Sequence, residues 1–204
     1  MILTGCETIV PPPAGSDSSM IVGKLNVDVS GTGISNTGSS GWVRTDRPSA
    51  AALILRNETS GKDYEIRAAF PDGFFALANA QPGHYRLLEL WAQVKTDDSY
   101  VTITSRFYKD IAFDLGPGRV ANLGVNDWNF SYDLSHSASA NDFVLNSDFP
   151  AVEQALHRFD AHSQWTGYRS DQVAFSGEAS AKPQAEALPP RDSNNQNVRP
   201  MITL

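Results

Sequence analysis

The sequence predicts a mainly β fold, an antiparallel β-sandwich followed by one C-terminal amphipathic helix and an extended tail. Apolar and polar residues alternate through residues 20–133, which is the period of half-buried strands. Clusters of Gly, Pro, Asp and Asn interrupt this alternation, and roughly eight strands separated by such turns are typical of a sandwich. With 204 residues and 41% hydrophobic composition, the chain is long enough for one core plus tails.

The strands follow from this alternation in order along the chain. A Gly/Ser/Thr-rich stretch at residues 30–41 predicts a loop after the first strand. Asn57 to Gly61 predicts a hairpin turn, Pro71-Asp72-Gly73 a second reversal, and Gln81-Pro82-Gly83 fits a type II turn. The predicted strands are residues 21–29, 52–56, 64–70, 74–79, 84–94, 101–107, 111–115 and 120–132.

A different period appears after residue 148. Phe149, Val152, Leu156 and Phe159 recur at three- and four-residue steps, which predicts an amphipathic helix at about residues 149–163, with Asp148 as its N-cap. The whole chain therefore divides into four parts. These are a truncated signal remnant with a Pro/Ser-rich tether at 1–19, the sandwich at 20–134, a linker and helix at 135–175, and an extended or disordered tail at 176–204.

The single cysteine is informative through its neighbours. Leu3-Thr4-Gly5-Cys6 resembles the bacterial lipobox, in which Cys is acylated and becomes the first residue of the mature lipoprotein. The alternative is a small apolar residue at an unstructured terminus. The resemblance implies that lipid on Cys6 attaches the chain to a membrane, and two or three acyl chains would make that attachment stable.

Residues 7–19 have the composition of a tether. They contain three consecutive prolines and then Ala-Gly-Ser-Asp-Ser-Ser. Thirteen extended residues reach roughly 40 Å. We therefore expect the folded body to stand clear of the lipid headgroups.

Two stretches carry a family resemblance. Residues 72–87, which read DGFFALANAQPGHYRL, resemble the signature of carboxypeptidase regulatory-like, or transthyretin-like, domains. Residues 113–124, which read FDLGPGRVANLG, are similar to a segment common in small bacterial lipoproteins with that sandwich. The resemblance implies a transthyretin-like (prealbumin-like) sandwich that serves as a structural or binding module without catalytic residues.

Charge and motif content exclude several function classes. A net charge of -7 would repel nucleic acid, and no apolar run is long enough to span a bilayer as a helix. His157 and His162 are five residues apart and would lie about 140° apart around a helix, so they would not chelate together. The sequence contains no HExxH and no GxSxG, and Asp97-Asp98 is better explained by a turn than by calcium. We expect no catalytic residue, no metal and no cofactor.

Aromatic residues are the remaining candidates for a binding site. Trp42, Tyr100 and Trp165 are candidate contacts for a ligand or partner, because exposed aromatic rings stack on sugars and form hot spots in protein interfaces. Trp42 is the best of the three because it borders the glycine-rich stretch. The alternative is that most aromatic rings fill the core or pin the helix.

The sequence thus predicts a noncatalytic lipoprotein of the cell envelope, anchored in the outer membrane on its periplasmic or outer face. We expect it to be a structural or binding subunit of a membrane-associated assembly, with a protein partner that contacts the helix and the C-terminal tail. The alternative is a carbohydrate- or peptidoglycan-binding module that uses exposed aromatics. An envelope hydrolase ranks third.

Overall fold

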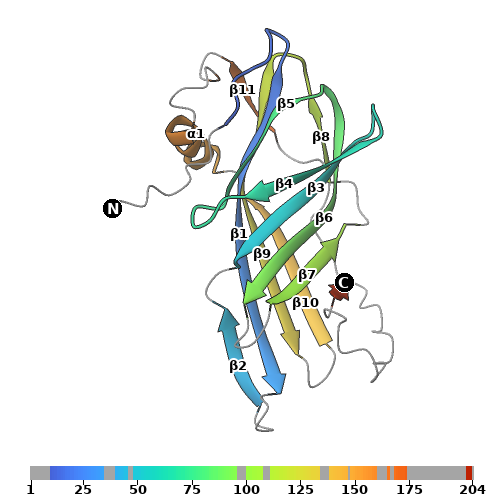
Figure 1. Ribbon diagram of the computed structural model, residues 1–204, viewed down its shortest axis with the longest axis vertical. Coiled ribbons are helices and arrows are strands. Elements are labelled where there is room, and N and C mark those ends of the chain that lie inside the picture. Colours follow the sequence, from blue (N-terminus) through green and yellow to red (C-terminus); the bar gives the residue numbers. More distant parts are fainter. Residues whose placement is uncertain are drawn as a thin grey trace.

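The computed structural model describes residues 10–34, 40–45, 48–95, 100–107, 111–133, 138–146, 148–159, 165, 168–173 and 201–203. The described chain forms two β-sheets and one helix, as Figure 1 shows, which confirms the predicted mainly β, sandwich-like fold. Most strand pairs are antiparallel, and the parallel exceptions were not predicted.

The first sheet is built on two long strands, β1 (Ser19–Ile34) and β9 (Arg119–Asp133), which run parallel to each other. Two short strands lie end to end along the free edge of β1, β5 (Phe74–Ala80) and then β2 (Ser40–Thr45). The free edge of β9 is lined in the same way by β11 (Arg169–Gln172) and β10 (Ala138–Asn146).

The second sheet is centred on β6 (Gly83–Lys95). One edge of β6 pairs with β3 (Ala50–Asn57), which forms the predicted hairpin with β4 (Lys62–Ala68). The other edge pairs with β8 (Ala112–Leu115) and then with β7 (Tyr100–Arg106). A final short strand, β12 (Met201–Thr203), runs parallel to β7.

The main core lies between the two sheets. It takes every second residue of the central strands, because successive side chains of a strand point to opposite faces. Leu25 of β1, Leu53 of β3, Leu87 of β6 and Trp128 of β9 are all fully buried there. The predicted inward face of the first strand is therefore confirmed at Leu25.

A second apolar cluster lies on the other side of the first sheet. Met20 and Val22 of β1 and Val120 of β9 point away from the main core, and α1 (Phe149–Phe159) packs over them through Val152 and Leu156. The predicted N-cap is confirmed, since Oδ1 of Asp148 accepts a hydrogen bond from the amide of Ala151 at 3.2 Å.

Two glycines allow the close approach of neighbouring segments. A Cβ on Gly73, which has a φ of 68°, would lie 2.3 Å from the carbonyl oxygen of Leu25. A Cβ on Gly23 would lie 2.4 Å from the ring of Phe75, its partner on β5. The reversal predicted at residues 71–73 is confirmed, and it carries the chain from β4 of the second sheet to β5 of the first.

Two sequence predictions were wrong in detail. The predicted loop at 30–41 is largely strand, because β1 extends to Ile34 and β2 begins at Ser40, and these residues pair with each other and with β9. The polar linker predicted after residue 134 contains β10, an antiparallel neighbour of β9. Polar residues suit an edge strand that packs on one side only, so composition did not reveal it.

Candidate functional site

The structure describes the four residues predicted for lipidation or binding to different extents. Cys6 lies outside the described residues. Trp42 lies on β2 and Tyr100 begins β7, and only their backbone belongs to the described part of the chain. Trp165 is described in full, and it is 1% exposed. Of the four, Trp165 alone has side-chain contacts within the described part of the chain.

Trp165 packs into the cluster under α1, so its ring offers no open face to a ligand. Its indole N–H donates a hydrogen bond of 2.6 Å to the carbonyl oxygen of Pro11, and its ring centroid lies 4.9 Å from that of Tyr168. This is the packing alternative that the sequence left open for the aromatic residues. Trp165 pins the N-terminal end of the chain to the C-terminal region.

The N-terminal segment, residues 10–18, is docked on the body along its length. Val10 is 2% exposed and belongs to the cluster under α1. Asn79 of β5 binds the segment twice, since its Nδ2 donates to the carbonyl oxygen of Pro12 at 3.1 Å and its Oδ1 accepts from the amide of Ala14 at 2.8 Å. Asn79 has a φ of 55°, a left-handed conformation that Asn tolerates better than most residues.

The far end of the same segment is also fixed. The hydroxyl of Tyr168 donates to the carbonyl oxygen of Gly15 at 3.0 Å, and the amide of Gly118 donates to that of Asp17 at 3.1 Å. The expectation of a free tether through residue 19 is therefore wrong for residues 10–18. Proline-rich composition predicts an extended chain, but it does not say whether that chain finds partners on the body.

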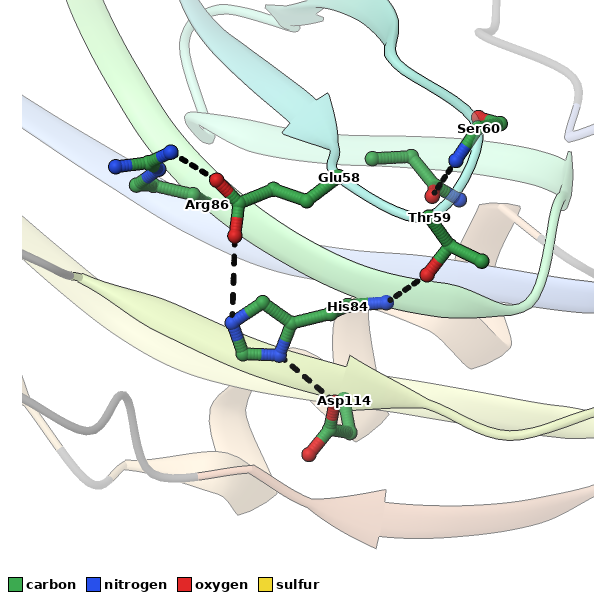
Figure 2. A network of polar contacts seen from close by, with 7 residues as sticks. Glu58, Thr59, Ser60, His84, Arg86 and Asp114 are labelled. Atoms are coloured by element: carbon green, nitrogen blue, oxygen red, sulfur yellow. Dashed lines mark hydrogen bonds and ion pairs between the residues drawn. The ribbon is translucent and has the colours of Figure 1, made fainter.

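A charged cluster lies at the end of the second sheet where the β3–β4 turn, β6 and β8 meet (Figure 2). The ring of His84 lies between two carboxylates. Its Nδ1 is 2.8 Å from Oδ1 of Asp114 and its Nε2 is 3.7 Å from Oε2 of Glu58. Arg86 pairs with the other oxygen of Glu58. We call Glu58, His84, Arg86 and Asp114 the His84 cluster.

Backbone pairing positions the His84 cluster. His84 on β6 stands opposite Asp114 on β8 in the antiparallel register. The amide of Glu58 donates to the carbonyl oxygen of His84 at 2.8 Å, while the amide of His84 donates to Oγ1 of Thr59 at 3.1 Å. The turn is thus held to β6 by hydrogen bonds in both directions.

Buried polar side chains lie next to the His84 cluster, towards the core. Asn57 is fully buried, and its side chain donates to the carbonyl oxygen of Gln81 at 3.1 Å and accepts from the amide of Ser60 at 3.0 Å. The phenol of Tyr85 also donates to the Gln81 carbonyl oxygen, at 2.6 Å. Burial raises the pKa of Tyr85 to about 12. The side chains beneath the His84 cluster are therefore tied to the turn before β6.

The His84 cluster is a network of polar contacts on the surface, in which Arg86 and Glu58 form an ion pair. The side chains of His84 and Asp114 are 45% and 86% exposed, and exposed pairs of this kind are screened by water. Sequence spacing alone indicates no partner for His84. Residues 84–94 and 111–115 are both predicted strands, but only the antiparallel register of β6 and β8 places His84 opposite Asp114.

Within the ranges that the structure describes, no group of three or more His, Cys, Asp or Glu side chains is arranged to hold a metal ion. No helix in the same ranges combines the length and apolar content needed to cross a bilayer. His157 is exposed on α1, and His162 lies outside the described residues.

Comparisons with known proteins show no family for this chain. A scan against models of protein families finds no match, and a search of curated proteins finds none. Among solved structures, one match is a leucine-rich repeat protein from Bacteroides thetaiotaomicron, with 12% identity and a TM-score of 0.32. The alignment covers 56% of this chain and 14% of that one, so the chain spans a small part of its length. A likeness this weak carries no argument about function.

Proposed function

We propose that this chain is a noncatalytic lipoprotein of the cell envelope, attached to the outer membrane by lipid on Cys6. The observation that carries the proposal is the order of features at the N-terminus. The lipobox-like Leu3-Thr4-Gly5-Cys6 is followed, within a few residues, by a segment that is built into the folded body. A lipid on Cys6 would therefore be linked to the sandwich by a docked segment and not by a free one.

The body suits a structural or binding role. The resemblance of residues 72–87 to carboxypeptidase regulatory-like domains supports a transthyretin-like sandwich, a fold that mostly serves such roles. The polar side chains of the His84 cluster contact one another and link the β3–β4 turn, β6 and β8. We place the contact with a protein partner at the outer face of α1, where Gln154 and His157 are exposed, and at the C-terminal tail.

Metabolic labelling of cells with palmitate tests the anchor. We expect label on the wild-type chain, none on Cys6→Ser, and accumulation of the unprocessed precursor when the lipoprotein signal peptidase is inhibited with globomycin. The Cys6→Ser chain should leave the membrane fraction. Label that persists on Cys6→Ser would contradict lipidation at this residue.

Cross-linking in intact cells tests the binding role. We expect cross-links from photoreactive groups at Gln154 and His157 to one defined protein, and none from the same group at Glu65, an exposed residue of β4 on the opposite sheet. Equal cross-linking at all three positions would contradict a partner at α1. Co-sedimentation with peptidoglycan that is lost on Trp42→Ala would instead favour the carbohydrate-binding alternative.

A further inference from the structure

We propose that the docked N-terminal segment holds the end of the body where β1 begins within about 10 Å of the bilayer that carries Cys6, so that this end, and not the β2 end, faces the membrane. The inference rests on the proposed lipidation of Cys6. It goes further because it names which face of the fold meets the lipid and at what distance. It also reverses the expectation of a body that stands clear of the membrane.

Covalent geometry sets the distance. Val10 is buried under α1, and only four residues of chain lead from Cys6 to it. Four fully extended residues span at most about 14 Å. The headgroup layer of one leaflet takes up about 5–8 Å of that length. Any water layer between the headgroups and Val10 is therefore thinner than about 10 Å, whatever path residues 6–10 take.

The position of the docked segment sets the orientation. Val10 contacts the cluster formed by Met20, Val152, Leu156 and Trp165, at the end of β1 where the strand begins. β1 has 16 residues and spans about 50 Å, with β2 paired to its far end. Figure 1 shows α1 and β11 in the upper part of the elongated body, with α1 on its side, and β2 at the lower end. A lipid on Cys6 therefore lies at the end where β1 begins.

The charge of this end is compatible with a lipid surface. The chain has a net charge of -7, which an anionic bilayer would repel. α1 contains one acidic residue, Glu153, and one arginine, Arg158, so with neutral histidine the helix adds no net charge. The helix itself therefore adds nothing to the repulsion from an anionic bilayer.

Neutron reflectometry of the lipidated protein in a supported phosphatidylcholine bilayer tests the distance. Intact mass first establishes whether the purified protein carries lipid. We expect the protein layer to begin within about 10 Å of the headgroups. A flexible Gly/Ser insert of about ten residues between Glu7 and Thr8, with an r.m.s. length of about 17 Å, should allow a thicker water layer, because more residues then separate Cys6 from Val10.

Nuclear magnetic resonance of isotope-labelled protein in nanodiscs tests the orientation. A lipid with a paramagnetic headgroup broadens the amide signals of the residues that lie near the membrane. We expect the amide signals of α1 to be broadened more than those of β2, and the insert to remove this difference. A water gap wider than about 10 Å beneath the wild-type protein layer, or equal broadening at both ends, would overturn the inference. An intact mass without lipid would overturn the lipidation itself.

Coupling the Cys6 thiol to a maleimide lipid then tests the distance and orientation of the body separately from the lipidation.

Discussion

The indole N–H of Trp165 donates a hydrogen bond of 2.6 Å to the carbonyl oxygen of Pro11, across 154 residues of sequence. This bond joins the segment before β1 to the segment after α1. Both segments cover the same apolar patch of the first sheet, which strands alone would leave open to water. The N-terminal segment is therefore a structural part of the domain.

Replacing Trp165 with Phe should destabilise the fold. The change keeps an aromatic ring in the cluster but removes the hydrogen bond to Pro11 and part of the buried volume, at a combined cost of about 1–3 kcal/mol. Urea unfolding followed by circular dichroism measures this cost. Tyr168→Phe, which removes the exposed hydrogen bond to Gly15, is the matched control and should cost less than about 1 kcal/mol. Equal costs for the two variants would contradict the structural role of Trp165.

Gly23→Ala should destabilise the first sheet by about 1–3 kcal/mol, because the added methyl group meets the ring of Phe75. Gly15→Ala is the control, since a Cβ there has nothing within 4 Å. Thermal unfolding compares the variants. Phe75→Leu in the Gly23→Ala background should recover part of the loss, and additive effects of the two changes would refute the steric explanation.

Tyr85 should make the fold lose stability in alkali. Burial raises the pKa of its phenol from 10.0 to about 12, so the unfolded chain releases the proton first. The unfolded state then binds fewer protons than the folded state, and the free energy of unfolding falls as pH rises. The contribution of neutral Tyr85 to the free energy of unfolding is complete below pH 10 and is lost between pH 10 and about 12. Its size is on the order of 2 kcal/mol.

Denaturant unfolding across that pH range, compared between the wild type and Tyr85→Phe, isolates this contribution from other groups. The Tyr85→Phe chain should show a shallower fall. Near-ultraviolet absorbance of phenolate should show one tyrosine that titrates late in the folded wild type and is missing from the variant. Parallel pH profiles for the two chains would refute the assignment.

The His84 cluster should contribute little to stability. A double-mutant cycle of His84→Ala and Asp114→Ala should give a coupling energy below about 1 kcal/mol, smaller at high salt, because both side chains are largely exposed. The free energy of unfolding of the four chains gives this value. A coupling of several kcal/mol that salt leaves unchanged would mean that the cluster is more than a surface network.

Strand positions in the second sheet were predictable because local signals agreed there. Asn57 to Gly61 has turn residues between two apolar runs, and the hairpin of β3 and β4 forms at that place. The first sheet was harder to predict. Gly31 and Gly33 suggest a loop, yet they pair with Val43 and Gly41 of β2, and Gly31 also pairs with Tyr132 of β9. Pairing on both edges overrides the weak strand propensity of glycine.

The candidate sites were less predictable than the fold. Nothing local indicates that Asn79 binds the segment around Pro12, because the contact joins residues 67 apart. The burial of Trp165 has the same cause, since its partners come from β1, α1 and the N-terminal segment. Sequence spacing reports neighbours along one strand or helix. It does not report contacts that depend on how sheets and terminal segments are arranged.

The parallel pairing of β1 with β9 sets an order of assembly. Met20 pairs with Val120, and the register continues to Thr32 and Asp133, so every pair joins residues about a hundred positions apart. During synthesis, β1 is among the first parts of the domain to emerge, but this partner comes only after most of the sandwich has been made. Closing so long a loop is slow, so we expect the pairing of β1 with β9 to form after the shorter-range pairing of β1 with β2 and β5. The partner edge of β1 thus stays unpaired in the nascent chain until β9, which ends at Asp133, has been made.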